Sequence, residues 1–158
     1  MKKVSLKNIE SNENVGLYSI FFEGADKTEF ERFLEKFRKE STLNKDFQTI
    51  LLALSKIIKF GALERFFRIE GKVNDDLCAL SLDSKKLRLY CLRISDQILI
   101  LGNGGVKETR TYQEDTTLSG YVMDLQKFDR LLKAAQKNGR IVIEKNCIIG
   151  LEEATFDL

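Results

Sequence analysis

Hydrophobic residues in the first third of the chain change from a β-rich run to helical spacing. Residues 17–22 form the β-rich run, which predicts a strand. Apolar residues then recur every three or four positions in two segments, which predicts helices over 28–40 and 44–61. Thr28 followed by Glu31 is a capping box at the start of the first helix. The short break between the two segments predicts an antiparallel helix pair.

Beyond these helices, apolar and polar residues alternate over several short segments. This alternation, interrupted by Gly, Asn and Asp, predicts strands. The expected strands cover residues 65–70, 77–82, 86–94, 97–101 and 106–112. The step from Ser95 to Asp96 between two apolar runs predicts a tight hairpin turn.

The two ends of the chain carry different patterns. Near the C-terminus, Asp124 is expected to open a third helix and Gly139 to close it. A terminal hairpin over 140–144 and 148–151 should follow. Residues 1–16 are polar with weak alternation, which predicts a mobile arm or an edge strand.

This order of elements predicts an α+β fold. We expect an N-terminal antiparallel helix pair packed on a mostly antiparallel sheet, with the C-terminal helix and hairpin as an extension over 120–158. A length of 158 residues is typical of a single domain, here 1–158. A hydrophobic content of 43%, with eleven Phe, is sufficient for one core.

Cysteine and histidine content restricts the chemistry. Cys78, Cys91 and Cys147 each lie in an apolar run without CxxC spacing, so we expect buried free thiols and neither a disulfide nor a metal site. The chain contains no histidine. Hydrolases built on a Ser-His or Cys-His pair are therefore excluded. No cofactor is expected.

Net charge is small but unevenly distributed. The chain carries +2 overall, whereas the segment from Ser84 to Tyr112 has six basic and two acidic residues and so +4. Nucleic-acid-binding proteins show such a confined basic stripe, and so do ordinary solvated sheet faces. No apolar run approaches the roughly 20 residues of a membrane span, and no signal peptide is visible, so we expect a cytoplasmic protein without membrane contact.

Gly102-Asn103-Gly104-Gly105 is the most unusual local sequence. Glycine-rich loops can bind phosphates through backbone N–H groups. The segment matches neither the dinucleotide fingerprint nor a Walker loop, and a bulge or bend at the sheet edge fits it better. We expect a positive φ at one of these glycines.

Basic and aromatic residues alternate with apolar ones in the expected strand over 86–94. The alternation places Lys86, Arg88 and Tyr90 on one face and Leu87 and Leu89 on the other. A face bearing Arg and Tyr can bind phosphates and stack a base. It can also cleave RNA without histidine: Arg and Lys neutralise the phosphate, while Tyr or Lys aligns the 2′-hydroxyl or protonates the leaving oxygen.

The helix pair, the "LRLYCLR" segment (87–93) and "DQILILGNGGVKETRTYQED" (96–115) resemble the RelE/HigB superfamily of type II toxin–antitoxin toxins, which includes phage-derived HigB-like members. In that family an Arg-bearing strand is followed by a second strand and a Lys/Arg-rich segment. The resemblance covers residues 28–115. One difference is that residues 77–82 lack the basic residues that many catalytic members carry there.

The resemblance implies a metal-independent mRNA endonuclease, acting free or on the ribosome and inhibited by a cognate antitoxin, here expected to be of helix-turn-helix type. Arg88 would contact the scissile phosphate, Lys107 and Arg110 would add catalytic basic groups, and Tyr112 would stack on or orient the 2′-hydroxyl. The residues expected to bind RNA around them are Lys85, Lys86, Tyr90 and Arg93.

Two alternatives remain open from the sequence. The first is a non-catalytic binding module on the RelE-like fold, such as a protein-targeting toxin or an accessory protein of a phage or mobile element. The missing basic residues of 77–82 favour it. The second is a small globular domain whose basic stripe is ordinary surface.

Overall fold

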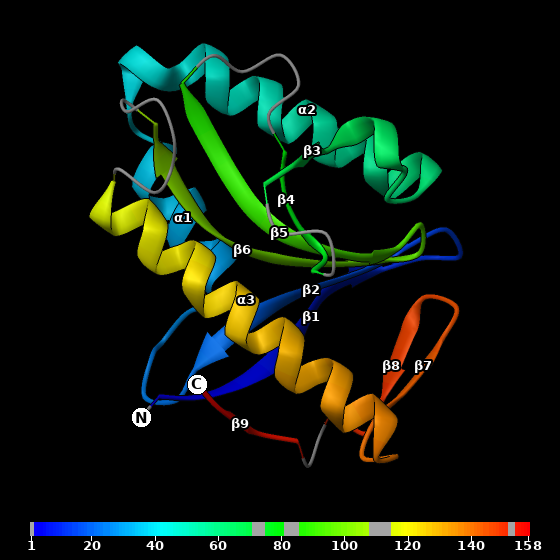
Figure 1. The fold of residues 1–158 in the computed structure, drawn as a ribbon. Helices are drawn as coiled ribbons and strands as arrows, with labels where there is room; N and C mark the ends of the chain where they lie inside the picture. Colours follow the sequence, from blue (N-terminus) through cyan, green and yellow to red (C-terminus); the bar gives the residue numbers. More distant parts are fainter. Residues whose placement is uncertain (1, 71–74, 81–85, 108–114, 152–153) are drawn as a thin grey trace.

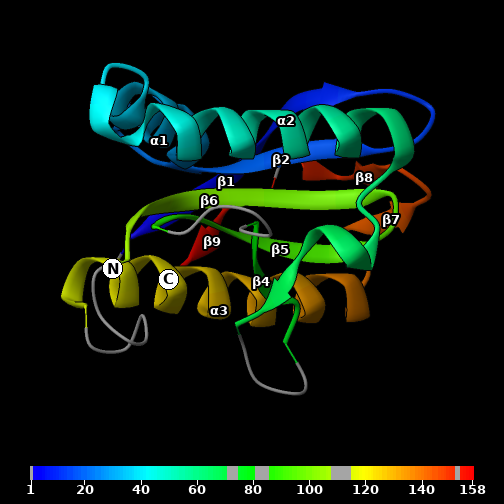
Figure 2. The ribbon, with the colours of Figure 1, turned by 90° about the horizontal axis from the view of Figure 1, so that it is seen from above.

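A seven-stranded sheet lies between two helical layers. The computed structural model describes residues 2–70, 75–80, 86–107, 115–151 and 154–158. Helices α1 and α2 cover one face of the sheet and α3 covers the other (Figures 1 and 2). The elements in chain order are β1 (Lys3–Ser11), β2 (Gly16–Phe22), α1 (Glu29–Phe37), η1 (Ser41–Leu43), α2 (Asn44–Phe60), η2 (Glu64–Phe66), β3 (Arg68–Ile69), β4 (Leu77–Leu80), β5 (Leu87–Ser95), β6 (Ile98–Val106), α3 (Thr116–Lys137), β7 (Val142–Glu144), β8 (Cys147–Ile149) and β9 (Phe156–Asp157).

The sheet is mostly antiparallel, as the sequence predicts, with strand order β3-β4-β5-β6-β2-β1-β9. Strands β2 and β6 pair in parallel, however, with Gly16 opposite Ile98 and Ser19 opposite Leu101. Parallel pairing was not expected, because no single helix separates two consecutive strands. The helix pair and the β3–β5 strands together form the crossover between β2 and β6. Strands β7 and β8 form a separate hairpin.

Local signals in the sequence correctly predicted both helices of the first layer. The Thr28 side chain accepts a hydrogen bond from the backbone of Glu31, whose side chain bonds back to Thr28 and completes the capping box. Helix α2 ends at Gly61, whose φ of 103° suits a residue without Cβ. The terminal hairpin also forms where expected, with Lys145 at φ 51° in its turn.

The third helix begins earlier than the sequence predicts. Asp115 caps it by accepting a hydrogen bond from the backbone N–H of Leu118 at 3.0 Å, and Asp124 lies within the helix. The early start was missed because Gly120 and two threonines weaken the helical signal of the first turns. The extra turns lengthen α3, which runs diagonally across this face of the sheet (Figure 1).

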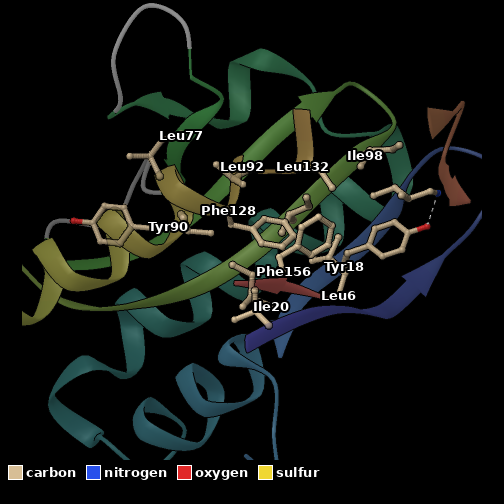
Figure 3. Close-up of a cluster of buried hydrophobic side chains, with 14 of the residues drawn as sticks. Leu6, Tyr18, Ile20, Leu77, Tyr90, Leu92, Ile98, Phe128, Leu132 and Phe156 are labelled. Atoms are coloured by element: carbon tan, nitrogen blue, oxygen red, sulfur yellow. Dashed lines mark hydrogen bonds between the residues drawn. The ribbon is translucent and has the colours of Figure 1, made fainter. Parts of the chain in front are cut away.

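Two hydrophobic clusters lie on opposite faces of the sheet. The cluster under α1 and α2 takes Leu87, Leu89 and Cys91 from β5. The cluster under α3 takes Tyr90 from the same strand and Phe128 from the helix (Figure 3). The predicted alternation of β5 is therefore correct. The expected open polar face is not, because α3 covers it.

The N-terminal residues form neither a mobile arm nor an edge strand. Strand β1 pairs with β2 on one side and with β9 on the other, where Val4 lies opposite Phe156. Phe156 also packs on Phe128 of α3, with ring centroids 5.0 Å apart. The C-terminal segment is thus part of the main core.

The glycine-rich segment lies inside β6 and does not form a loop. Opposite Tyr90, β6 carries two residues, Gly102 and Asn103, in place of one, so the expected bulge is present, although in a central strand and not at the sheet edge. None of its glycines has a positive φ, so that expectation is wrong. Glycine is required here because neighbouring atoms approach the backbone of β6 too closely for a side chain to fit. A Cβ on Gly102 would lie 2.8 Å from Leu125 of α3, and one on Gly104 would lie 1.8 Å from the carbonyl oxygen of Arg88.

We predict that Gly104→Ala destabilises the protein while Gly120→Ala stabilises it. The first Cβ meets backbone that cannot rotate away, so the loss in unfolding free energy should reach the upper end of the roughly 1–3 kcal/mol typical of overpacking. A Cβ on Gly120, in the interior of α3, would have no neighbouring atom within 4 Å, so Gly120→Ala should raise the free energy of unfolding by about 1 kcal/mol. Denaturant unfolding of both variants measures the difference. Equal stability of the two would contradict the close packing of β5 and β6.

Candidate functional site

Three basic residues of the sequence-predicted set meet at one end of strands β5 and β6. Arg88 lies opposite Gly105, and the N–H of Lys107 donates to the carbonyl oxygen of Lys86 at 2.8 Å. Residues opposite one another in an antiparallel pair point to the same face. Lys86, Arg88 and Lys107 therefore share a face, and we call them the basic end.

Helix α2 holds the strand at the basic end in place. Asp46, in the first turn of α2, accepts hydrogen bonds from the backbone N–H groups of Lys86 at 2.9 Å and Leu87 at 3.2 Å. The side chain of Lys86 is exposed and that of Lys107 is half-buried. Both ammonium groups can therefore reach a phosphate while their backbone stays fixed.

Arg88 is less accessible than the sequence suggests. It points away from Leu87 and Leu89, as expected, but only 6% of its surface is exposed. Its Nη1 donates to the carbonyl oxygen of Leu87 at 3.3 Å. The expectation of an Arg88 side chain open to solvent is thus corrected, because α3 lies on this face.

Two further residues of the set have structural surroundings. Tyr90 is fully buried in the core under α3, so its ring has no face open to a base. Arg93 donates from Nε to the carbonyl oxygen of Ala62 at 2.7 Å and forms ion pairs with Asp96 and Glu64. These contacts fasten the β5–β6 turn to the end of α2. Neither side chain belongs to the basic end.

The remaining members of the set, Lys85, Arg110 and Tyr112, lie outside the described residues. Lys107 is the last described residue before Arg110 and Tyr112 in the chain. The structure thus brings together three of the eight predicted residues and gives Tyr90 and Arg93 other surroundings.

A second polar site, which the sequence did not predict, lies where β2 and β6 separate. The two strands pair only from Gly16 to Ser19 on β2 and from Ile98 to Leu101 on β6. Beyond that point the chain from β2 leads to α1 on one face, whereas α3 follows β6 on the other face (Figure 2). Side chains of α1 and α3 meet across the gap, which we call the crevice. Its principal polar residues are Glu29, Arg32, Lys36, Asn103, Tyr121 and Asp124.

Lys36 connects three elements in the crevice. Its Nζ donates to the carbonyl oxygen of Gly104 on β6 at 2.9 Å and to the hydroxyl of Tyr121 on α3 at 3.1 Å. The same ammonium lies 4.9 Å from the centre of the Tyr121 ring, within the range of a cation–π contact. Lys36 thus holds the hydroxyl end of the Tyr121 side chain.

Glu29 and Asn103 form the buried floor of the crevice. The bulge in β6 turns Asn103 towards α1, where its Nδ2 lies 3.4 Å from Oε1 of Glu29. Nη1 of Arg32 lies 3.4 Å from Oε2 of Glu29. Both contacts are longer than the usual 2.7–3.2 Å. Among the described residues, the buried Glu29 carboxylate therefore has one long hydrogen bond from Asn103 and one long ion pair with Arg32.

The crevice contains two adjoining cavities. One has a volume of about 360 Å³ and the other about 620 Å³, and Arg32 and Tyr121 line both. The spacing of Glu29, Arg32 and Lys36 along one helical stripe was the signal available in the sequence. It was missed because α3 was expected to start after Tyr121.

The cysteines divide into a buried pair and an exposed residue. Cys78 and Cys91 lie opposite one another on β4 and β5, with their sulfur atoms 3.6 Å apart as free thiols. Burial raises the pKa of the Cys91 thiol well above its usual value, and the hydrogen bond with Cys78 raises it further. Cys147 is exposed on β8, so the expectation of three buried thiols is wrong for this residue.

Two other classes of site are absent from the described part of the chain. No group of His, Cys, Asp or Glu side chains there is arranged to hold a metal ion. None of its helices combines the length and the apolar character that crossing a bilayer requires.

Comparison with known proteins gives no assignment. No protein-family model, no curated protein and no solved structure matches this chain.

We predict that one thiol, Cys147, reacts with a thiol reagent in the native protein. The thiolate is the reactive species, and burial together with a raised pKa suppresses it at Cys91. Titration with a chromogenic disulfide should show one fast thiol at pH 8 and three after unfolding in denaturant. Cys147→Ser should lose the fast thiol of the native protein and show two thiols after unfolding. Two fast thiols in the native protein would contradict the burial of the pair.

Proposed function

We propose that the protein is a RelE/HigB-like toxin that binds and cleaves RNA at the basic end of β5 and β6. The observation that carries this proposal is the convergence of Lys86, Arg88 and Lys107 on one face at the end of these two strands. Phosphate contacts from such side chains supply a large share of the affinity of nucleic-acid-binding proteins.

The order of elements supports the same proposal. Two helices on one face of a sheet are followed by the antiparallel strands β4, β5 and β6, of which β5 carries Arg88. This is the order that the resemblance to RelE/HigB toxins implies. We propose that the helix pair has the arrangement of that superfamily and that a helix-turn-helix antitoxin inhibits the protein.

In the proposed reaction the 2′-hydroxyl of the RNA loses its proton to water and attacks the adjacent phosphorus. A 2′,3′-cyclic phosphate forms, and the 5′-oxygen leaves as a hydroxyl after taking a proton from a lysine ammonium. Lys86 and Lys107 hold the phosphate and neutralise the charge that develops on it. We assign Arg110 and Tyr112, which follow Lys107 in the chain, to the remaining charge stabilisation and to the alignment of the hydroxyl. Arg88, buried between the strands and α3, positions the backbone of the basic end through its contact with Leu87.

A second candidate is a non-catalytic RNA-binding or protein-binding module on the same fold. It is favoured by the burial of Arg88 and Tyr90, which removes two of the predicted chemical groups from the surface. An assay of RNA cleavage distinguishes the two functions, because the module would bind its target without cleaving it.

We predict that induction of this protein alone arrests bacterial growth and that co-expression of a neighbouring helix-turn-helix gene restores it. Cleavage of mRNA should appear in primer-extension profiles within minutes of induction. Growth arrest with intact mRNA would support the non-catalytic module. Normal growth at high soluble expression would refute the toxin function.

We predict that Lys86→Gln/Lys107→Gln weakens RNA binding and reduces its salt dependence. A single strand releases about 0.7 counterion per phosphate neutralised, so losing two contacts should lower the slope of log K against log salt by about 1.4. Fluorescence anisotropy with a labelled single-stranded RNA at several salt concentrations measures the slope.

A charge-matched control separates this effect from net charge. Lys56→Gln/Lys127→Gln removes two exposed lysines from the helices α2 and α3 and should leave the slope nearly unchanged. The same loss of slope in both double variants would argue that the basic end has no special role.

A further inference from the structure

We propose that the crevice between α1 and α3 binds a single nucleotide, with its phosphate at Arg32 and Lys36 and its base against Tyr121. Insofar as this nucleotide is a unit of RNA, the inference rests on the proposed function. A free nucleotide would have the same chemistry.

The topology creates an open site at this place. Strands β2 and β6 are adjacent and parallel, and the elements that follow them lie on opposite faces of the sheet. In open sheets a crevice forms outside the carboxyl ends of such strands, because neither connection covers the gap, and ligands bind there. The two cavities lie in this crevice, and together they are in the size range of small-molecule sites.

The side chains that line the two cavities include five basic and five acidic ones, so the crevice as a whole is neutral and an anion is favoured only locally, next to Lys36. Three of its cations are paired with carboxylates: Lys27 with Glu35, Lys2 with Asp124 and Arg32 with Glu29. Lys36 donates to two neutral oxygens, and within the described residues it has no carboxylate partner.

Arg32 adds further donors next to Lys36. It contacts Glu29 through Nη1 alone, while its side chain is 56% exposed. The two cations stand four residues apart on one side of α1, so their donors converge on one place. A phosphate fits them better than a cation or a neutral group does.

An aromatic ring adjoins these cations. Tyr121 lines both cavities, and Lys36 holds the hydroxyl end of its ring. The larger cavity is also lined by Phe22. Nucleotides stack on such rings irrespective of base identity. The two cations can bind the phosphate of a nucleotide, and the neighbouring ring, which borders a cavity of about 620 Å³, can stack on its base.

The buried Glu29 carboxylate adds a preference among bases. Its two oxygens have only contacts of 3.4 Å, so it can accept two better hydrogen bonds. The Watson–Crick edge of guanine offers two adjacent N–H donors that match the two oxygens of one carboxylate. Uracil offers a single N–H between two acceptors. We therefore assign guanine as the preferred base.

The experiment is calorimetric titration of the full-length protein with 5′-GMP, 5′-UMP and inorganic phosphate. We expect saturable binding of 5′-GMP, about fivefold or more tighter than 5′-UMP, because a good bidentate contact discriminates bases by at least this factor. Phosphate alone should bind more weakly still. Equal affinity for 5′-GMP and phosphate would overturn the proposal and reduce the crevice to an anion site.

Variants locate the site. Lys36→Gln and Tyr121→Leu should each weaken 5′-GMP binding by about fivefold or more. Lys56→Gln, the charge-matched control on α2, should not change it. Glu29→Gln should abolish the preference for 5′-GMP over 5′-UMP, with circular dichroism as the check on folding. Should Glu29→Gln fail to fold, unchanged 5′-GMP affinity in folded Lys36→Gln would still overturn the proposal.

Competition with RNA identifies the source of the nucleotide and separates this inference from the proposed function. A single-stranded oligonucleotide containing one guanosine should displace 5′-GMP, and Lys86→Gln/Lys107→Gln should weaken the oligonucleotide but not 5′-GMP. Oligonucleotide binding without any 5′-GMP binding would overturn the crevice site and leave the proposed function intact. Binding of 5′-GMP without RNA binding or cleavage would support a site for a free nucleotide and refute the RNA function.

Discussion

The close approach of α3 to the glycine-rich half of β6 is the contact on which the rest of the structure depends. A Cβ on Gly102 would lie 2.8 Å from the Leu125 side chain and force it to shift, and a Cβ on Gly105 would lie 3.2 Å from the Leu118 side chain and press on it more mildly. Because the helix lies this close, it buries Arg88 and Tyr90 and brings Tyr121 within reach of Lys36. The glycines of β6 thus act through packing and not through an unusual backbone conformation.

The same approach accounts for the position of both proposed sites. On the β5 side of β6, the basic end carries two accessible lysines above a buried arginine. On the β2 side, the strands have separated and the helices of the two faces meet across the gap. The carbonyl oxygen of Gly104 accepts a hydrogen bond from Lys36, and the backbone of the same residue packs against that of Arg88. A short piece of one strand therefore borders both surfaces.

Features set by neighbouring residues could be predicted from the sequence, and features set by distant segments could not. The capping box at Thr28, the glycine that ends α2 and the turn at Lys145 each depend on a few adjacent residues. The alternation of β5 was also correct, but a strand pattern does not say which face a later helix will cover. The crevice needs α1, β6 and α3 at once, so the polar stripe on α1 could not be interpreted without the position of α3.

The parallel pairing of β2 with β6 also has a consequence for the rate of folding. The Ser19 hydroxyl bonds to the carbonyl oxygen of Leu101, 82 positions away in the chain, and Tyr18 bonds to Ile148 over 130 positions. Each such contact closes a long loop whose entropy is lost before the pairing stabilises the chain. Chains dominated by contacts of this kind fold over milliseconds to seconds, far more slowly than helical bundles. The helix pair and the β4–β5 strands, which close shorter loops, can form first, and the β2–β6 seam that borders the crevice should be among the last parts to close.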